Sequence, residues 1–259
     1  MDQDPITRAI GYLSEAFETG NPLAPLPAEI AITTQDDAEE VAGGVLARLG
    51  FAPCGIRVAP AADGSLITGP MLEARFLDDG AGLSLEIMRH GRASAALLGV
   101  LGAALEPEAT SPPEITAIHP ALDISASRFT QGPADRLAEI ADLAGLGLLV
   151  LGKRRPIPET PSRVALIEGE GAARGRPFNL HAAFAQAAAE ARRLGGLPAG
   201  AVLIVAGLGA PAFKPTTGAP SPANTNTAPA GKPTKRRASA AAWAKAVCRS
   251  KGLPRAAPS

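Results

Sequence analysis

The chain has 259 residues, 46% of them hydrophobic and 19% charged, so it has the composition of a globular protein that can bury a sizeable core. The two cysteines, Cys54 and Cys248, are too few for a disulfide framework and lack the spacing of a metal site. The acidic start of the chain lacks the basic and apolar regions of a signal peptide, and glycine and proline interrupt the longest uncharged stretch, 194–213. We therefore expect a cytoplasmic protein that does not span a membrane.

The net charge of zero hides an uneven distribution along the chain. Residues 211–259 contain nine Lys or Arg and no Asp or Glu, whereas residues 1–210 contain 16 Lys or Arg and all 25 Asp and Glu. Residues 211–230 are mostly Pro, Ala, Thr, Ser and Asn, which predicts a linker that leads into a flexible basic tail over 219–259. Because Trp243 is the only aromatic residue among its basic side chains, nucleic-acid binding is disfavoured against docking on the acidic part or a plain disordered extension.

The order of the predicted elements indicates a helical start followed by a β-rich core. Apolar residues recur at helical spacing over 5–19 and over 36–49, and Thr34 or Asp36 is expected to cap the second helix. Short apolar runs separated by Gly, Pro and Asp predict strands at 56–58, 71–76, 83–88, 95–101, 120–128, 146–151, 164–168 and 202–206. Further helices are predicted at 112–119, 135–143 and 180–194. We expect one α/β domain over 1–218, with a helical part over 1–50 and the β-rich core over 51–210.

Few residues form a pattern that identifies a reaction. The sequence contains no nucleophile elbow, no phosphate-binding loop and no HExxH metal motif. His90, His119 and His181 lie far apart, without ligand spacing, and are expected to be structural or surface residues. Glu106 and Glu108 have a spacing that would let a strand hold one cation, but the proline between them predicts a loop.

Four segments resemble one known family, in the family's order. PALDISASR at 120–128 resembles the PALEIxDSR strand of the 2-keto-4-pentenoate hydratase family, part of the fumarylacetoacetate hydrolase superfamily. The other segments are GIRV at 55–58, IADLA at 140–144 with LLVLG at 148–152, and LPAGAVLIVAG at 197–207. The resemblance covers residues 5–218 and implies a mixed α+β, fumarylacetoacetase C-terminal-like fold with a rolled β core and flanking helices. It also implies a lyase that binds a 2-keto acid or dienol through an Mg²⁺ or Mn²⁺ ion, which three carboxylates coordinate.

The chain departs from the family at the implied metal ligands. Two strand glutamates of the family fall on Ser94 and Ala96, and the third carboxylate is Asp123. A single carboxylate is a poor site for Mg²⁺, which needs several hard oxygen ligands. We therefore expect a degenerate metal site and an impaired or lost metal-dependent activity, unless a shifted alignment restores a ligand at Glu73 or Glu86.

Two further hypotheses stay open beside an impaired hydratase. In the first, the chain is a non-catalytic protein that binds a small 2-keto acid, forms a homo-oligomer or assists an active paralogue, and Asp123, Arg128 and Asp142 hold loops together. In the second, it is a metal-independent lyase. Arg57 stands at the position of the family lysine and stays charged, so it would bind a substrate carboxylate rather than move a proton. Asp123 would then be the acid or base, and Arg128 and Asp142 would help to bind the substrate.

Overall fold

The computed structural model describes residues 4–61, 63–82, 88–157, 162–164 and 176–213. The helices are α1 (Pro5–Thr19), α2 (Gln35–Arg48), α3 (Arg136–Ala141) and α4 (Leu180–Arg193), with 3-10 turns η1 (Ala28–Ile30) and η2 (Glu73–Arg75). The strands are β1 (Gly55–Pro60), β2 (Leu66–Met71), β3 (Phe76–Asp78), β4 (Arg92–Leu101), β5 (Ile115–Ser125), β6 (Leu148–Leu151), β7 (Ser162–Val164), β8 (Arg176–Phe178) and β9 (Val202–Phe213). Within these ranges, no helix combines the length and the apolar character needed to cross a membrane. The predicted strand residues 83–87 and 165–168 and the predicted tail 219–259 lie outside the described residues.

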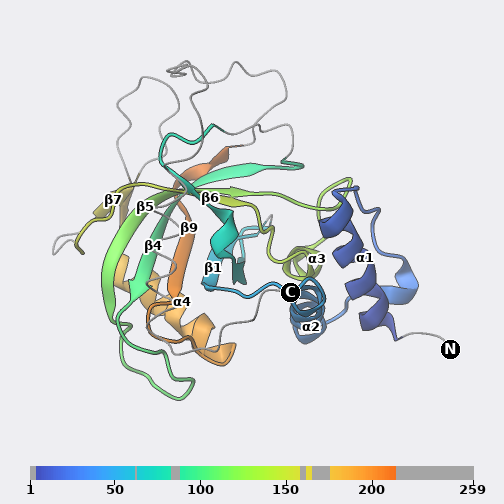
Figure 1. Ribbon diagram of the computed structural model, residues 1–259, viewed down its shortest axis with the longest axis horizontal. Coiled ribbons are helices and arrows are strands. Elements are labelled where there is room, and N and C mark those ends of the chain that lie inside the picture. Colours follow the sequence, from blue (N-terminus) through green and yellow to red (C-terminus); the bar gives the residue numbers. More distant parts are fainter. Residues whose placement is uncertain (1–3, 62, 83–87, 158–161, 165–175, 214–259) are drawn as a thin grey trace, which may run out of the picture.

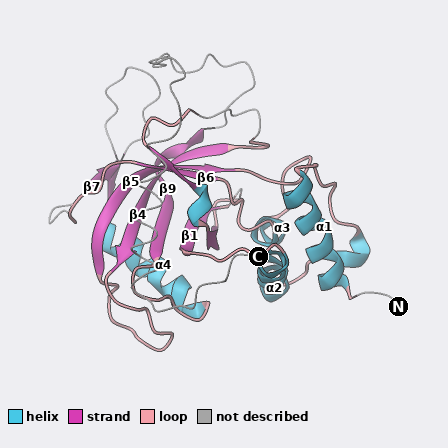
Figure 2. Cartoon of the chain, viewed as in Figure 1, coloured by secondary structure: helices cyan, strands magenta, loops and turns pink. Residues whose placement is uncertain are grey.

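Seven strands form one mixed sheet in the order β2-β1-β9-β4-β5-β6-β3, and β7 pairs with β8 separately. Strand β9 runs parallel to β1 and antiparallel to β4, so the last described strand in the sequence joins the pair β1 and β2 to the other four strands of the sheet. The sheet is strongly curved (Figure 1). Figure 2 shows α1, α2 and α3 gathered at one side of the sheet, while α4 crosses another part of it. This mixed α+β arrangement with a curled sheet and flanking helices confirms the predicted fold class.

The two N-terminal helices form where the sequence predicts them because both ends carry local signals. Asp4 caps α1 by accepting a hydrogen bond from the backbone of Thr7, and Gly20 ends this helix with a left-handed φ of 70°. Of the two residues proposed to cap α2, Thr34 does so, in a reciprocal capping box with Asp37.

The sheet buries both of its faces, in two hydrophobic clusters. Leu98 and Ile204 belong to the cluster shared with α1, α2 and α3. Leu97 and Leu203, their chain neighbours, belong to the cluster that contains Phe184 of α4. Since side chains alternate between the faces of a strand, β4 and β9 are apolar on both sides.

Two predicted elements are wrong. The stretch 112–119, predicted as a helix, contains the start of β5 at Ile115, where β-branched Ile and Thr residues follow two prolines. The stretch 71–76, predicted as one strand, contains the end of β2, the η2 turn and the start of β3. Most of β2 was not predicted, because Gly69 and Pro70 look like loop residues; β2 is an edge strand, where proline is tolerated.

Candidate functional site

A buried ion pair lies inside the curl of the sheet. Arg57 on β1 donates from Nε to Oδ1 and from Nη2 to Oδ2 of Asp123 on β5, each at 2.6 Å. Its Nη1 donates to the carbonyl oxygen of Ala144 at 2.8 Å. Arg57 is 5% exposed and Asp123 is 3% exposed. Strands β9 and β4 lie between β1 and β5 in the sheet. The two side chains can meet because the sheet curls and brings β1 and β5 opposite each other.

Ser94 and Ala96 of β4, where the family resemblance implies two glutamates, lie next to this pair. Ser94 is the direct cross-strand partner of Asp123, and Ala96 faces Ala121 two residues further along the same face. The hydroxyl of Ser94 donates to Oδ2 of Asp123 over 3.5 Å and accepts the backbone N–H of Gly207 at 3.0 Å. The structure therefore brings Arg57, Ser94, Ala96 and Asp123 together, although their roles in any reaction remain predictions.

Glu139 on α3 is a charged neighbour that the sequence analysis missed. Burial lowers the pKa of Arg57, but the charge and hydrogen bonds of Asp123 raise it more, and the charge of Glu139 adds to the upward shift. Glu139 is itself only 9% exposed. A glutamate in a short amphipathic helix normally lies on the polar face, so the sequence carried no signal of this position.

Arg128 and Asp142, the other two predicted site residues, form a second ion pair, in which Asp142 is buried and Arg128 is partly buried. The guanidinium of Arg128 donates from Nε to Oδ1 of Asp142, and at 2.6 Å each to the carbonyl oxygens of Asp142 and Leu146. It also stacks over the ring of Phe17, 4.3 Å from the ring centroid. Burial raises the pKa of Asp142, and the charge and hydrogen bonds of Arg128 oppose that rise.

Both ion pairs hold the same turn, between α3 and β6. Leu143, Ala144 and Gly145 follow one another with φ values of 53°, 51° and 68°. Such left-handed conformations are unfavourable for the two residues that are not glycine. Arg57 binds the middle of this turn and Arg128 binds both of its ends. The contacts of Arg128 are therefore those of a residue that fixes a loop, which is the role that the non-catalytic hypothesis gives it.

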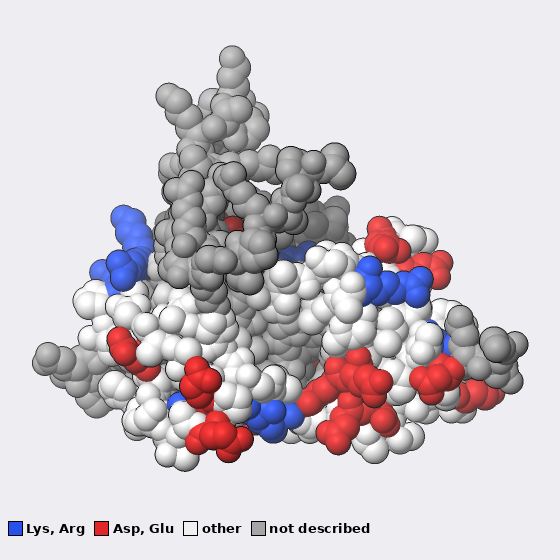
Figure 3. All heavy atoms as spheres, turned by 60° about the horizontal axis from the view of Figure 1, so that its bottom comes forward, with Lys and Arg blue, Asp and Glu red and all other residues white. Residues whose placement is uncertain are grey.

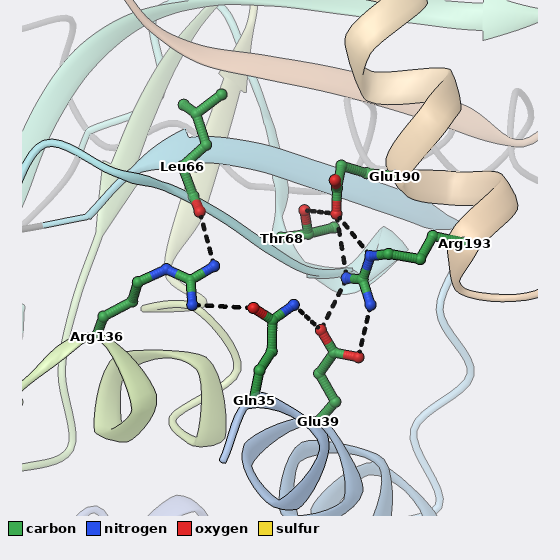
Figure 4. Close-up of polar contacts among 7 residues, drawn as sticks. All are labelled: Gln35, Glu39, Leu66, Thr68, Arg136, Glu190 and Arg193. Atoms are coloured by element: carbon green, nitrogen blue, oxygen red, sulfur yellow. Dashed lines mark hydrogen bonds and ion pairs between the residues drawn. The ribbon is translucent and has the colours of Figure 1, made fainter. Parts of the chain in front are cut away.

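A third polar cluster joins the helices to β2 at the surface (Figure 4). Arg193 of α4 donates from its two terminal nitrogens to the carboxylate of Glu39 on α2, at 2.9 and 2.7 Å, and from Nε to Glu190 at 3.1 Å. Gln35 donates to Glu39 and accepts from Arg136 of α3. The hydrogen bond from Arg193 is the main cause of a lowered pKa at Glu39. This cluster fixes elements from both sides of the sheet against each other.

Acidic side chains gather on the face of the molecule that Figure 3 shows, where basic side chains are fewer. This agrees with the excess of Asp and Glu in residues 1–210. Docking of the basic tail on this acidic part stays a prediction, since residues 219–259 lie outside the described ranges.

The residues around Asp123 do not fit the divalent metal ion that the family resemblance implies. Both oxygens of Asp123 already accept hydrogen bonds from Arg57, and the facing positions of β4 offer one hydroxyl and one methyl group. In the part of the chain that the structure describes, no three His, Cys, Asp or Glu side chains are grouped as metal ligands. Glu73, one of the two alternative ligands, is exposed on η2, and Glu86, the other, lies outside the described residues.

Comparison with known proteins identifies the fold. No protein-family model matches the sequence, and no curated protein matches it. Two solved structures of 4-oxalocrotonate decarboxylase from Pseudomonas putida G7 are similar, each with 14% sequence identity over 82% of this chain and 97% of that chain. The complex with magnesium and adipate gives a TM-score of 0.61, and the complex with calcium and acetate gives 0.59. The chain therefore shares the fold of this decarboxylase.

Proposed function

We propose that this chain is a 2-keto-4-pentenoate hydratase-like protein in which the metal-dependent lyase reaction of that family is impaired or lost. The observation that carries the proposal is the pair Ser94 and Ala96, which stand on β4 beside Asp123 where the resemblance implies two glutamates. A hydroxyl and a methyl group supply at most one neutral ligand, whereas Mg²⁺ is bound through carboxylates, waters and substrate oxygens. The fold of a 4-oxalocrotonate decarboxylase and the order of the sequence motifs support the link to this group of lyases.

The protein then acts by binding rather than by turnover. Its ligand is a small 2-keto acid, and its assemblies are a homo-oligomer or a complex with an active paralogue. Two observations support this role. The structural match covers 97% of the decarboxylase chain, and the residues at the implied ligand positions of this chain are substituted.

Turnover of freshly generated 2-hydroxypenta-2,4-dienoate, followed by the loss of its ultraviolet absorbance, tests the proposal. The assay is run with Mg²⁺, with Mn²⁺ and with EDTA, on protein whose folding is verified by circular dichroism. We expect no turnover in EDTA and, with either metal ion, at most a small fraction of the rate of an active hydratase. Metal-dependent turnover at the rate of an active hydratase would refute the proposal, because it requires a carboxylate set that Ser94 and Ala96 do not supply.

A metal-independent lyase that uses Arg57 and Asp123 predicts a different result. Its turnover would be insensitive to EDTA and would disappear in Asp123→Ala. The geometry favours the non-catalytic function, because all three nitrogens of Arg57 already donate, two of them to Asp123 and one to the carbonyl oxygen of Ala144. Thermal unfolding with 2-oxopentanoate in EDTA tests the binding role: a rise in the midpoint supports a 2-keto acid ligand, and no change favours a subunit that recognises another protein.

A further inference from the structure

The carboxylate of Asp123 needs a positive partner, since it lies on an inner strand and is only 3% exposed. A buried carboxylate without a counter-charge is strongly unfavourable, and the usual solutions are an ion pair or a metal ion. Arg57 forms such an ion pair, and the contact is bidentate: each carboxylate oxygen accepts one N–H from Arg57 at 2.6 Å. This is the most favourable geometry for such a pair.

We propose that the guanidinium of Arg57 is a built-in cation, which takes the place that a divalent metal ion would have in this site. The inference deepens the proposed function and rests on it. Toward the described residues, Arg57 donates three hydrogen bonds, two to Asp123 and one to the carbonyl oxygen of Ala144. The guanidinium therefore neutralises the carboxylate and joins three segments, as a metal ion with ligands from several elements does.

The two β4 residues next to the pair are suited to a monovalent organic cation rather than to a metal ion. Ser94 presents a hydroxyl to the carboxylate, and it is itself held by the backbone N–H of Gly207. Ala96 presents only a methyl group. A divalent ion at Asp123 would have to displace the guanidinium, because each oxygen of the carboxylate already accepts an N–H from Arg57. The position of Arg57 thus disfavours a metal ion even where one carboxylate survives.

The built-in cation also connects parts of the sheet that are not neighbours. Arg57 lies on β1 and Asp123 on β5, with β9 and β4 between them. Its bond to Ala144 extends this connection to the turn that follows α3. Because the cation is covalently attached to the chain, neither loading with metal nor chelation should change the stability of the fold.

The first test uses the unaltered full-length protein. We expect the midpoint of thermal unfolding to be the same in EDTA, in Mg²⁺ and in Mn²⁺, and calorimetric titration with Mn²⁺ to give no binding. A lower midpoint in EDTA, or micromolar binding of Mn²⁺, would overturn the inference. Because these measurements concern binding and stability, they remain decisive whichever result the turnover assay gives.

The second test removes the charges one at a time. Arg57→Gln leaves Asp123 without its counter-charge, whereas the double variant Arg57→Gln with Asp123→Asn removes both charges of the pair; Glu139 is the same in both variants. We expect the single variant to unfold at a lower temperature than the double variant, because an unpaired buried charge costs more than the loss of the whole pair. A double variant that is less stable than Arg57→Gln would contradict this role.

The third test exchanges the organic cation for a metal ion. Ser94→Glu with Ala96→Glu adds two carboxylates to the strand that faces Asp123, and the matched variant also carries Arg57→Gln. We expect Mn²⁺ to bind at least about tenfold more tightly when Arg57 is replaced. Equal binding by the two variants would show that the guanidinium does not compete with the ion. If either variant fails to fold, the measurements on the unaltered protein decide the question.

Discussion

Removal of the Asp142 carboxylate tests the idea that the second ion pair is a structural support of the fold. The side chain of Asp142 is completely buried, and it accepts hydrogen bonds from the hydroxyl of Ser127 at 2.9 Å and from the backbone N–H of Arg128 at 3.0 Å. It also accepts the Nε–H of Arg128. Asp142→Ala therefore leaves three donors without their acceptor, one of them on a charged group.

The expected loss in the free energy of unfolding depends on the contacts that Arg128 keeps in the variant. Breaking a buried ion pair by removal of one partner costs about 3–5 kcal/mol. Arg128 retains its hydrogen bonds to the carbonyl oxygens of residue 142 and of Leu146, and its stacking on Phe17. These contacts place the loss at the lower end, about 3 kcal/mol. Since a domain is stabilised by only about 5–15 kcal/mol, the change is large enough to measure without ambiguity.

Urea unfolding, followed by circular dichroism, gives the free energy of unfolding for each variant. The matched control is Asp135→Ala, which removes an exposed carboxylate whose one described hydrogen bond is the cap of α3, to the backbone of Ala138 at 2.8 Å. Loss of such a cap costs about 1 kcal/mol. Equal losses in the two variants would refute the reasoning, because burial and pairing would then contribute nothing beyond a surface cap.

Two further predictions concern the packing and the charge of the N-terminal helices. In α2, Gly44→Ala should lower the free energy of unfolding by about 1–3 kcal/mol, because a Cβ would lie 2.2 Å from an isoleucine side chain of α1. The neighbouring Gly43→Ala should raise it by about 0.5–1 kcal/mol, since a Cβ there meets nothing within 4 Å and alanine favours a helix; urea midpoints in the reverse order would contradict this packing. The ion pair with Arg193 lowers the pKa of Glu39, so its contribution of about 0.2–1 kcal/mol is present above the ordinary pKa and is lost as the pH falls through the folded-state value. Between about pH 5 and pH 3, Glu39→Gln should therefore lose less stability than the parent, and equal losses in urea unfolding would contradict this role of the ion pair.

Local signals in the sequence predicted the helices better than the strands. The residues of α1 agree with the prediction, and α2 lies within one residue of it, because apolar periodicity and capping residues act within one turn. The strand β2 was missed because its glycine and proline are tolerated only at the edge of a sheet, and edge position is a property of the whole fold. Two prolines at 112 and 113 favour a helix start, but the β-branched residues after them begin the long strand β5.

Three residues that lie together around the buried ion pair were singled out from the sequence, but not their arrangement. Family resemblance placed Arg57, Ser94 and Asp123 in one site, and the structure brings them together. The pairing of Arg57 with Asp123 depends on the curl of the sheet, which no pattern within one strand encodes. Glu139 was missed for a similar reason, since only tertiary packing buries this helix residue and brings its charge close enough to raise the pKa of Arg57.

The central position of β9 has a consequence for how the chain folds during synthesis. Strand β9 is the last of the described strands, yet it is the neighbour of both β1 and β4. Until a ribosome has released it, β1 with β2 and the group β4, β5, β6 and β3 have no common strand, and both would expose apolar edges. The parallel pairing of Gly55 with Val202 closes a loop of about 150 residues, a non-local contact of the kind that slows folding. We therefore expect the nascent chain to remain incomplete and prone to aggregation until β9 emerges.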